Sequence, residues 1–184
     1  MRTMTIIKSS LPDDSLLNLP GKKYDYADCF RGSIIDKQNK LNSTDIGNAF
    51  FSSAPEWVDK LFGLRNSIVG LFGLKNSQNR IARQKIKDIS KFEKGDQIGF
   101  FKLFDKTNKE IILGEDDKHL NFRVSLFMDE GKDNRIEKHI TISTLVIFNN
   151  WFGRIYFLPV KSFHKLIVPA MLKAMIKQLE TIIS

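Results

Sequence analysis

The residues whose types and spacing could do chemistry lie in one short stretch, residues 114–127, which reads GEDDKHLNFRVSLF. Asp117, His119 and Arg123 supply a carboxylate, an imidazole and a guanidinium within seven positions. Strand alternation places His119 and Arg123 on one face, and the polar face of a one-sided antiparallel sheet is normally the solvated one. We therefore favour a solvated strand face. The alternative is a small polar site in which Arg123 pairs with Asp117 or binds an anion.

Other reactive side chains are few and scattered. The three histidines, His119, His139 and His164, are far apart in the sequence and show no metal-ligand spacing, so no metal site is predicted. Cys29 is the single cysteine, which excludes an internal disulfide. It has no neighbouring base that would mark it as a nucleophile, and we interpret it as a partly buried structural residue. We expect no cofactor and no catalytic residue.

The composition is that of a globular protein. With 184 residues, 42% of them hydrophobic, the chain suits one domain over residues 1–184, in which residues 1–20 form a leader that is free to be flexible. No apolar run approaches the roughly 20 residues of a membrane helix, and no secretory signal is evident, which predicts a cytoplasmic protein. The net charge is +8, but the basic stretch 75–94 lacks interleaved aromatics. A nucleic-acid partner is therefore not favoured, and no oligomeric state is indicated.

Hydrophobic periodicity predicts the order of elements. Residues 22–34 alternate as a first strand, Ser43 or Thr44 can cap a helix, and Pro55 can begin a second helix. Five extended segments follow, separated by turn residues: 98–106, 109–115, 119–129, 135–149 and 153–160.

A long C-terminal helix, capped by Ser162, completes the order. Its apolar residues are predicted to share one broad face that covers the sheet: Phe163, Leu166, Ile167, Met171, Met175 and Leu179. Pro169 should kink this helix or start it anew. The predicted fold class is α+β, a helix-grip (START-like) fold with one strand, two short helices and an antiparallel meander curled around the C-terminal helix.

Three runs carry a resemblance to a known family: WVDKLFGLRNSIVGLFGLK, LGEDDKHLNFRVS and TLVIFNNWFGRIYFLPVKSFHKLIV. They resemble the bacterial domain-of-unknown-function family 2867. The resemblance implies a START-like fold, and it implies relatives that occur alone or fused behind an NAD(P)-binding domain like those of short-chain reductases. The chain departs from that pattern because it has no GxGxxG stretch and because Pro169 interrupts the last helix.

The predicted fold can leave a cavity between the sheet and the C-terminal helix, or side chains can fill that space. We expect a non-enzymatic domain that binds a small apolar molecule there. The lining is predicted to comprise Trp57, Phe122, Trp151, Tyr156, Phe163, Met171 and Met175. Two other classes stay open: an enzyme or accessory domain that acts with a reductase-type partner, and a partner-binding module marked by an exposed apolar patch.

Overall fold

A computed structural model describes residues 5–53, 55, 88–99, 101–131 and 134–183. Seven antiparallel strands form one sheet in the order β1-β2-β7-β6-β5-β4-β3. The strands are β1 (Ile7–Ser9), β2 (Tyr26–Ile35), β3 (Gln97–Ile98), β4 (Phe101–Lys106), β5 (Glu110–Asp116), β6 (Leu120–Gly131) and β7 (Asn134–Phe148). The helices are α1 (Ser43–Ser52), the short 3-10 helix η1 (Ile89–Lys91) and α3 (Trp151–Ile183).

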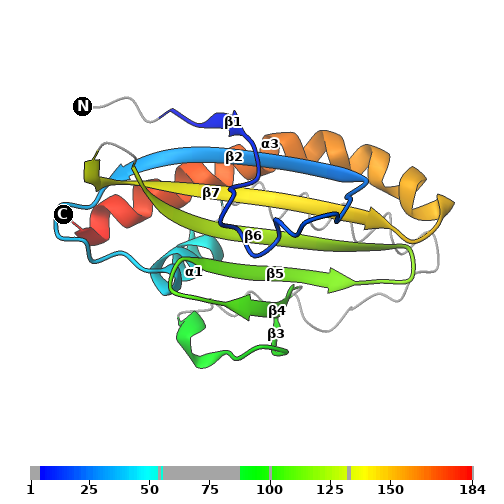
Figure 1. Ribbon diagram of the computed structural model, residues 1–184, viewed down its shortest axis with the longest axis horizontal. Coiled ribbons are helices and arrows are strands. Elements are labelled where there is room, and N and C mark those ends of the chain that lie inside the picture. The colour runs from blue at the N-terminus through cyan, green and yellow to red at the C-terminus, as the bar shows by residue number, and fades with distance from the viewer. Residues whose placement is uncertain (1–4, 54, 56–87, 100, 132–133, 184) are drawn as a thin grey trace.

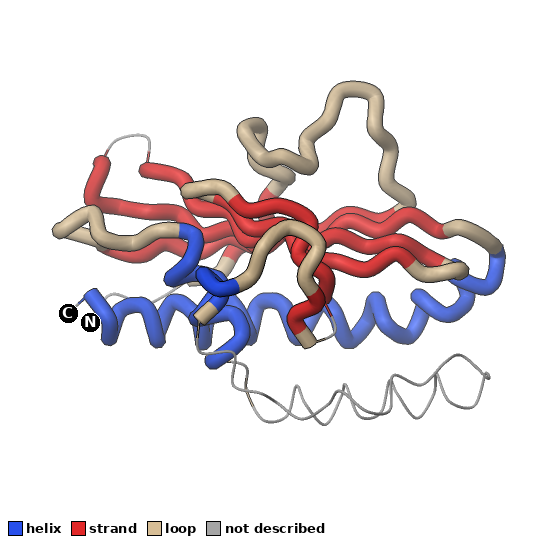
Figure 2. Tube along the Cα trace, turned by 90° about the horizontal axis from the view of Figure 1, so that it is seen from below, coloured by secondary structure: helices blue, strands red, loops and turns tan. Residues whose placement is uncertain are grey.

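The helix α3 runs along one face of the sheet (Figures 1 and 2) and contacts β2, β7 and α1. We call this face of the sheet the inner face and the opposite one the outer face. The α+β class and a helix-grip-like arrangement are thus confirmed. Among the described helices, none is both long and apolar enough to cross a membrane.

The main core lies between the inner face, α1 and α3. Alternate residues of the long strands point inward, because successive side chains of a strand lie on opposite faces. Fully buried members include Leu113 on β5, Leu126 on β6 and Ile142 on β7. Leu172 and Ile176 of α3 are also fully buried against them. The second half of α3 therefore packs on the inner face and completes the main core.

The start of α3 differs from the prediction. Residues 153–160 were predicted to form a strand and instead lie within α3, which begins at Trp151. The Asn150 side chain explains this start, because its Oδ1 accepts the backbone N–H of Gly153 at 3.0 Å, as an N-cap residue does. Ser162 is consequently an interior helix residue, and Pro169 neither ends the helix nor starts a new one.

The buried face of α3 also differs in its first half. Phe163 and Leu166 were predicted to face the sheet, but they are 38% and 66% exposed. Phe157 and Val168 are the buried apolar residues of this region, and Met171, Met175 and Leu179 continue the same face. A helix presents only part of its surface to a sheet, and the rotation of α3 about its axis turns Phe163 and Leu166 away from that part.

The middle of the outer face is covered, although this polar face was expected to be solvated; His119 and Arg123, for which that expectation was made, are partly exposed. The chain between β1 and β2 crosses it (Figure 1), and Leu17 packs there against Ile112 and Leu145. As a result, the polar residues Ser125 and Ser143 of this face are fully buried. Strand alternation identified the two faces, but it did not reveal that the leader would cover the polar one.

The first helix follows the prediction closely. α1 spans Ser43–Ser52, and its cap is Asn42 rather than Ser43 or Thr44. The Asn42 side chain accepts hydrogen bonds from the backbone N–H groups of Thr44 and Asp45. In turn, the Asp45 carboxylate accepts a hydrogen bond from the Asn42 N–H. The predicted second helix, from Pro55 onward, and most of the basic stretch 75–94 lie outside the described residues.

Candidate functional site

A polar cluster lies on the mainly apolar inner face, beneath the first half of α3. It consists of Tyr26 and Asp28 on β2 and His164 on α3. The Asp28 carboxylate accepts a hydrogen bond from the Tyr26 hydroxyl, and its Oδ2 lies 3.1 Å from Nδ1 of His164. Asp28 is only 5% exposed. Strand alternation puts Tyr26, Asp28 and Gly32 on the same face of β2. Because Gly32 has no side chain, Ile176 of α3 can pack directly against it.

The electrostatics of the cluster keep Asp28 charged. Burial would raise the pKa of Asp28, but hydrogen bonds from His164 and Tyr26 and the positive charges of His164 and Lys8 together hold it below its usual value. Burial raises the pKa of Tyr26, and the hydrogen bond and charge of Asp28 raise it further. At neutral pH the cluster thus presents a buried carboxylate and a phenol that remains a hydrogen-bond donor.

Two buried oxygens of this region have no hydrogen-bond partner within the described part of the chain. They are Oδ1 of Asp28 and Oγ1 of Thr144. Thr144 lies directly opposite Asp28 in the β2–β7 register, so both side chains occupy neighbouring positions on the inner face. Buried polar atoms are almost always satisfied, so these two oxygens lack the partner that such atoms normally have.

Aromatic rings surround the cluster. The Tyr26 ring lies 4.8 Å from that of Phe157, and Phe157 lies 5.4 Å from Phe148. The Lys161 ammonium lies 5.4 Å from the centre of the Tyr26 ring. The carboxylate is therefore held within an apolar, aromatic environment, in which each hydrogen bond to it is stronger than in water.

The residues Asp117, His119 and Arg123 do not converge into a site. Arg123 pairs with Asp116, at 2.8 and 3.1 Å, and not with Asp117. Its guanidinium carbon lies 3.4 Å from the ring centre of Phe104. His119 Nδ1 lies 3.1 Å from Nδ2 of Asn150, in the turn that supports the start of α3. The alternative in which Arg123 pairs with Asp117 is therefore wrong, because Asp116 is the partner of Arg123.

The residues predicted to line an apolar site are dispersed. Phe122 is half-buried on the inner face of β6, next to the ring of Phe101, and Tyr156 is half-buried on α3. Met171 and Met175 lie in the main core. Trp151 and Phe163 are exposed, and Trp57 lies outside the described residues.

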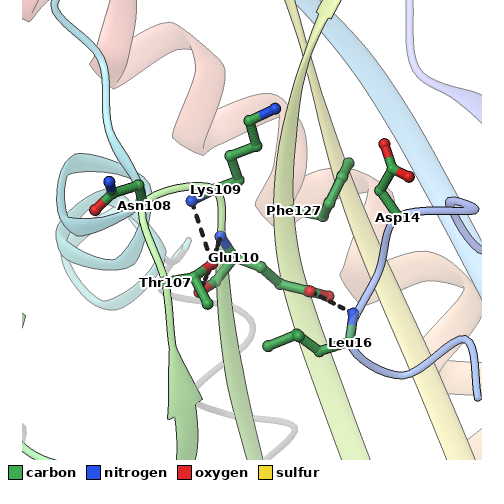
Figure 3. Close-up of a pocket in the computed structure, with 7 residues that line it drawn as sticks. All are labelled: Asp14, Leu16, Thr107, Asn108, Lys109, Glu110 and Phe127. Atoms are coloured by element: carbon green, nitrogen blue, oxygen red, sulfur yellow. Dashed lines mark hydrogen bonds between the residues drawn. The ribbon is translucent and has the colours of Figure 1, made fainter.

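A pocket of about 330 Å³ opens on the outer side, between the leader and the turn that joins β4 to β5 (Figure 3). Its deepest polar group is Glu110, which is buried. The Glu110 carboxylate accepts hydrogen bonds from Ser15 Oγ at 2.6 Å, from the Leu16 N–H at 2.7 Å and from Ser125 Oγ. Glu110 therefore links the leader to β5 and β6.

Sequence reasoning did not single out Asp28. The sequence did carry a signal, because strand alternation puts Asp28 on the same side as Tyr24, Tyr26 and Phe30. A carboxylate in such a row requires a buried partner. That partner, His164, is 136 residues away, and only the packing of α3 brings it near.

Two other kinds of reactive group are metal-ligating side chains and the single cysteine. Within the described ranges, no three His, Cys, Asp or Glu side chains lie close enough together to hold a metal ion. Cys29 is buried, and burial raises the pKa of its thiol, which keeps it in the unreactive protonated form.

Comparison with known proteins gives one match. No curated protein and no solved structure matches the chain significantly. A family model described as Protein of unknown function (DUF2867) matches residues 21–171, which is most of the chain and includes Tyr26, Asp28 and His164. The chain therefore belongs to the DUF2867 family of proteins of unknown function.

Proposed function

We propose that this protein binds a small, mainly apolar molecule beneath the first half of α3, and that Asp28 receives a hydrogen bond from the one polar donor of that molecule. The observation that carries the proposal is the buried Asp28 carboxylate, whose Oδ1 has no partner among the described residues. An unsatisfied buried oxygen costs about 1–3 kcal/mol, which a ligand hydroxyl or amine would recover.

The position of the site follows from the packing of α3. Leu172, Met175 and Ile176, in the second half of the helix, are fully buried within the main core. The first half instead presents His164 and Phe157 to the inner face, where Tyr26 and Asp28 lie. A ligand with an apolar body would contact the aromatic rings, and its single donor would bind the Asp28 carboxylate.

The test is a ligand screen by native mass spectrometry and thermal shift. The probes are medium-chain and aromatic alcohols, each paired with the hydrocarbon that lacks the hydroxyl. We expect a subset of the alcohols to raise the melting temperature, since ligand at 100 times its Kd stabilises by about 2.7 kcal/mol. The matched hydrocarbons should bind more weakly.

The variants are Asp28→Asn, which removes the charge at similar size, and Asp129→Asn as its control. Asp129 pairs with Arg31 at 3.3 Å on the outer face, away from the proposed site. The first variant should lose the preference for alcohols, and the second should keep it. The proposal fails if no alcohol binds, or if Asp28→Asn retains the full preference.

A second candidate, a proton-transfer enzyme, is favoured by the Asp28–His164 contact. A carboxylate bonded to Nδ1 of a histidine fixes the ring and leaves Nε2 to exchange a proton with a substrate. This candidate includes an accessory role beside a reductase-type partner. Mass analysis of each bound probe after incubation distinguishes the two candidates, because a binding protein returns the molecule unchanged and an enzyme alters its mass or isotope content in deuterated water.

A further inference from the structure

The side of α3 that faces away from the sheet carries a row of exposed apolar residues. Trp151, Ile155, Leu158 and Leu166 are 70%, 56%, 65% and 66% exposed. Their spacing of three, four and eight positions places them along one side of the helix. At about 1.5 Å per residue, the row is about 23 Å long. We call these four residues the outward row.

Positive charge accompanies the outward row. α3 contains Arg154, Lys161, Lys165, Lys173 and Lys177, and its single acidic residue is Glu180. All five cationic side chains are on exposed residues. Arg154 is paired with Asp25, and Lys161 lies over the Tyr26 ring. The lysines at 165, 173 and 177 have no ion pair within the described structure, so α3 is strongly basic along its exposed side.

The charge decides between the possible occupants of this surface. A second copy of the chain packed face to face would bring two basic helices together, and such like-charge contacts cost several kcal/mol. An anionic surface would gain from the same lysines. Trp, Ile and Leu beside lysines are also the residues that a helix uses when it lies in the headgroup region of a bilayer, with its apolar side inserted and its lysine stems extended.

We propose that the outward row docks on an anionic phospholipid surface. The apolar side chains enter the headgroup region, and Lys165, Lys173 and Lys177 contact lipid phosphates and carboxylates. This surface lies on the side of α3 opposite to Asp28, so docking does not depend on the proposed ligand site. If ligand binding fails its own test, the docking proposal is unaffected.

The experiment is co-sedimentation of the full chain with vesicles of phosphatidylcholine, with or without a minor fraction of phosphatidylserine. We expect binding to the anionic vesicles that weakens as salt concentration rises. The double variant Leu158→Asp/Leu166→Asp should lose at least tenfold in apparent affinity. Its control is Leu19→Asp, which makes the same change at an exposed leucine of the leader, away from α3.

A second variant tests the charge without altering the apolar row. Lys165→Gln/Lys173→Gln should weaken anionic binding by about fivefold for each lysine removed, with unchanged folding. The proposal is overturned if the protein ignores anionic vesicles, if it binds neutral vesicles equally, or if the double leucine variant binds like the parent. It is also overturned if light scattering shows a dimer that the double leucine variant disrupts, because the row would then be a subunit interface.

Discussion

Asp28 on β2 and His164 on α3 lie 136 residues apart in the sequence, and their side chains meet at 3.1 Å beneath the helix. The contact joins β2 to the first half of α3, where few apolar side chains are buried. It therefore has two roles. It positions the Asp28 carboxylate of the proposed ligand site, and it stabilises the packing of the first half of α3 on the sheet.

The first prediction concerns acid stability. The folded pKa of Asp28 lies below the unfolded value of about 3.9, so its contribution is present above that value and is lost as pH falls through the folded pKa. Burial alone would raise this pKa, and the hydrogen bonds from His164 and Tyr26 with the charges of His164 and Lys8 lower it. We expect unfolding free energy to fall with pH below about 4, and to fall less steeply in Asp28→Asn.

Urea unfolding at a series of pH values measures this effect. Tyr26→Phe serves as the comparison, because it removes one of the hydrogen bonds to Asp28 and should weaken the acid dependence only in part. If the parent and Asp28→Asn lose unfolding free energy equally as pH falls, the pKa of Asp28 is the same in the folded and unfolded states, and the prediction is wrong.

The second prediction concerns the leader. Glu110 is 1% exposed and accepts hydrogen bonds from Ser15, Leu16 and Ser125. Glu110→Gln turns one acceptor into a donor, so at least one buried donor loses its partner, at a cost of about 1–3 kcal/mol. Limited proteolysis should then cut within residues 10–20 faster than in the parent.

Ser15→Ala is the milder control, because it removes one hydrogen bond and leaves the carboxylate in place. We expect a smaller loss of stability and slower leader cleavage than in Glu110→Gln. If both variants resist proteolysis like the parent, the apolar contact of Leu17 with Ile112 and Leu145 holds the leader without help from Glu110.

The third prediction concerns the start of α3. A Cβ at Gly153 would collide with the backbone carbonyl of His119, so only glycine allows the helix to pack on the turn before β6. Gly153→Ala should cost about 1–3 kcal/mol in urea unfolding, although alanine favours helix formation. Ser162→Ala, at an exposed position of the same helix, should be neutral or slightly stabilising. A stabilised Gly153→Ala would mean that the turn moves freely.

How much the sequence predicts depends on the range of the interactions. The strand segments within residues 98–149 were predicted because alternation is local, and α1 was predicted because its cap lies next to it. The start of α3 was misread because residues 149–153 were interpreted as a turn between two strands, and the Asn150 cap was not recognised. Ser15 and Leu17 carry no periodic pattern, and their partners lie about 95 positions away on β5. Contacts of that range, like Asp28 with His164, arise only from packing.

The last prediction distinguishes the observed orientation of α3 from the one that periodicity suggested. Both orientations bury Met171 and Met175, but only the observed one exposes Leu166. Met175→Ala, at a fully buried site, should cost about 2–5 kcal/mol, as large-to-small core changes do. Met171→Ala should fall in the same range if its site is closely packed, and lower if it borders a ligand cavity. Leu166→Ala should change the unfolding free energy by less than about 0.5 kcal/mol, as surface changes do. A large loss in Leu166→Ala, beside a small one in Met175→Ala, would show that α3 is rotated about its axis from the orientation described.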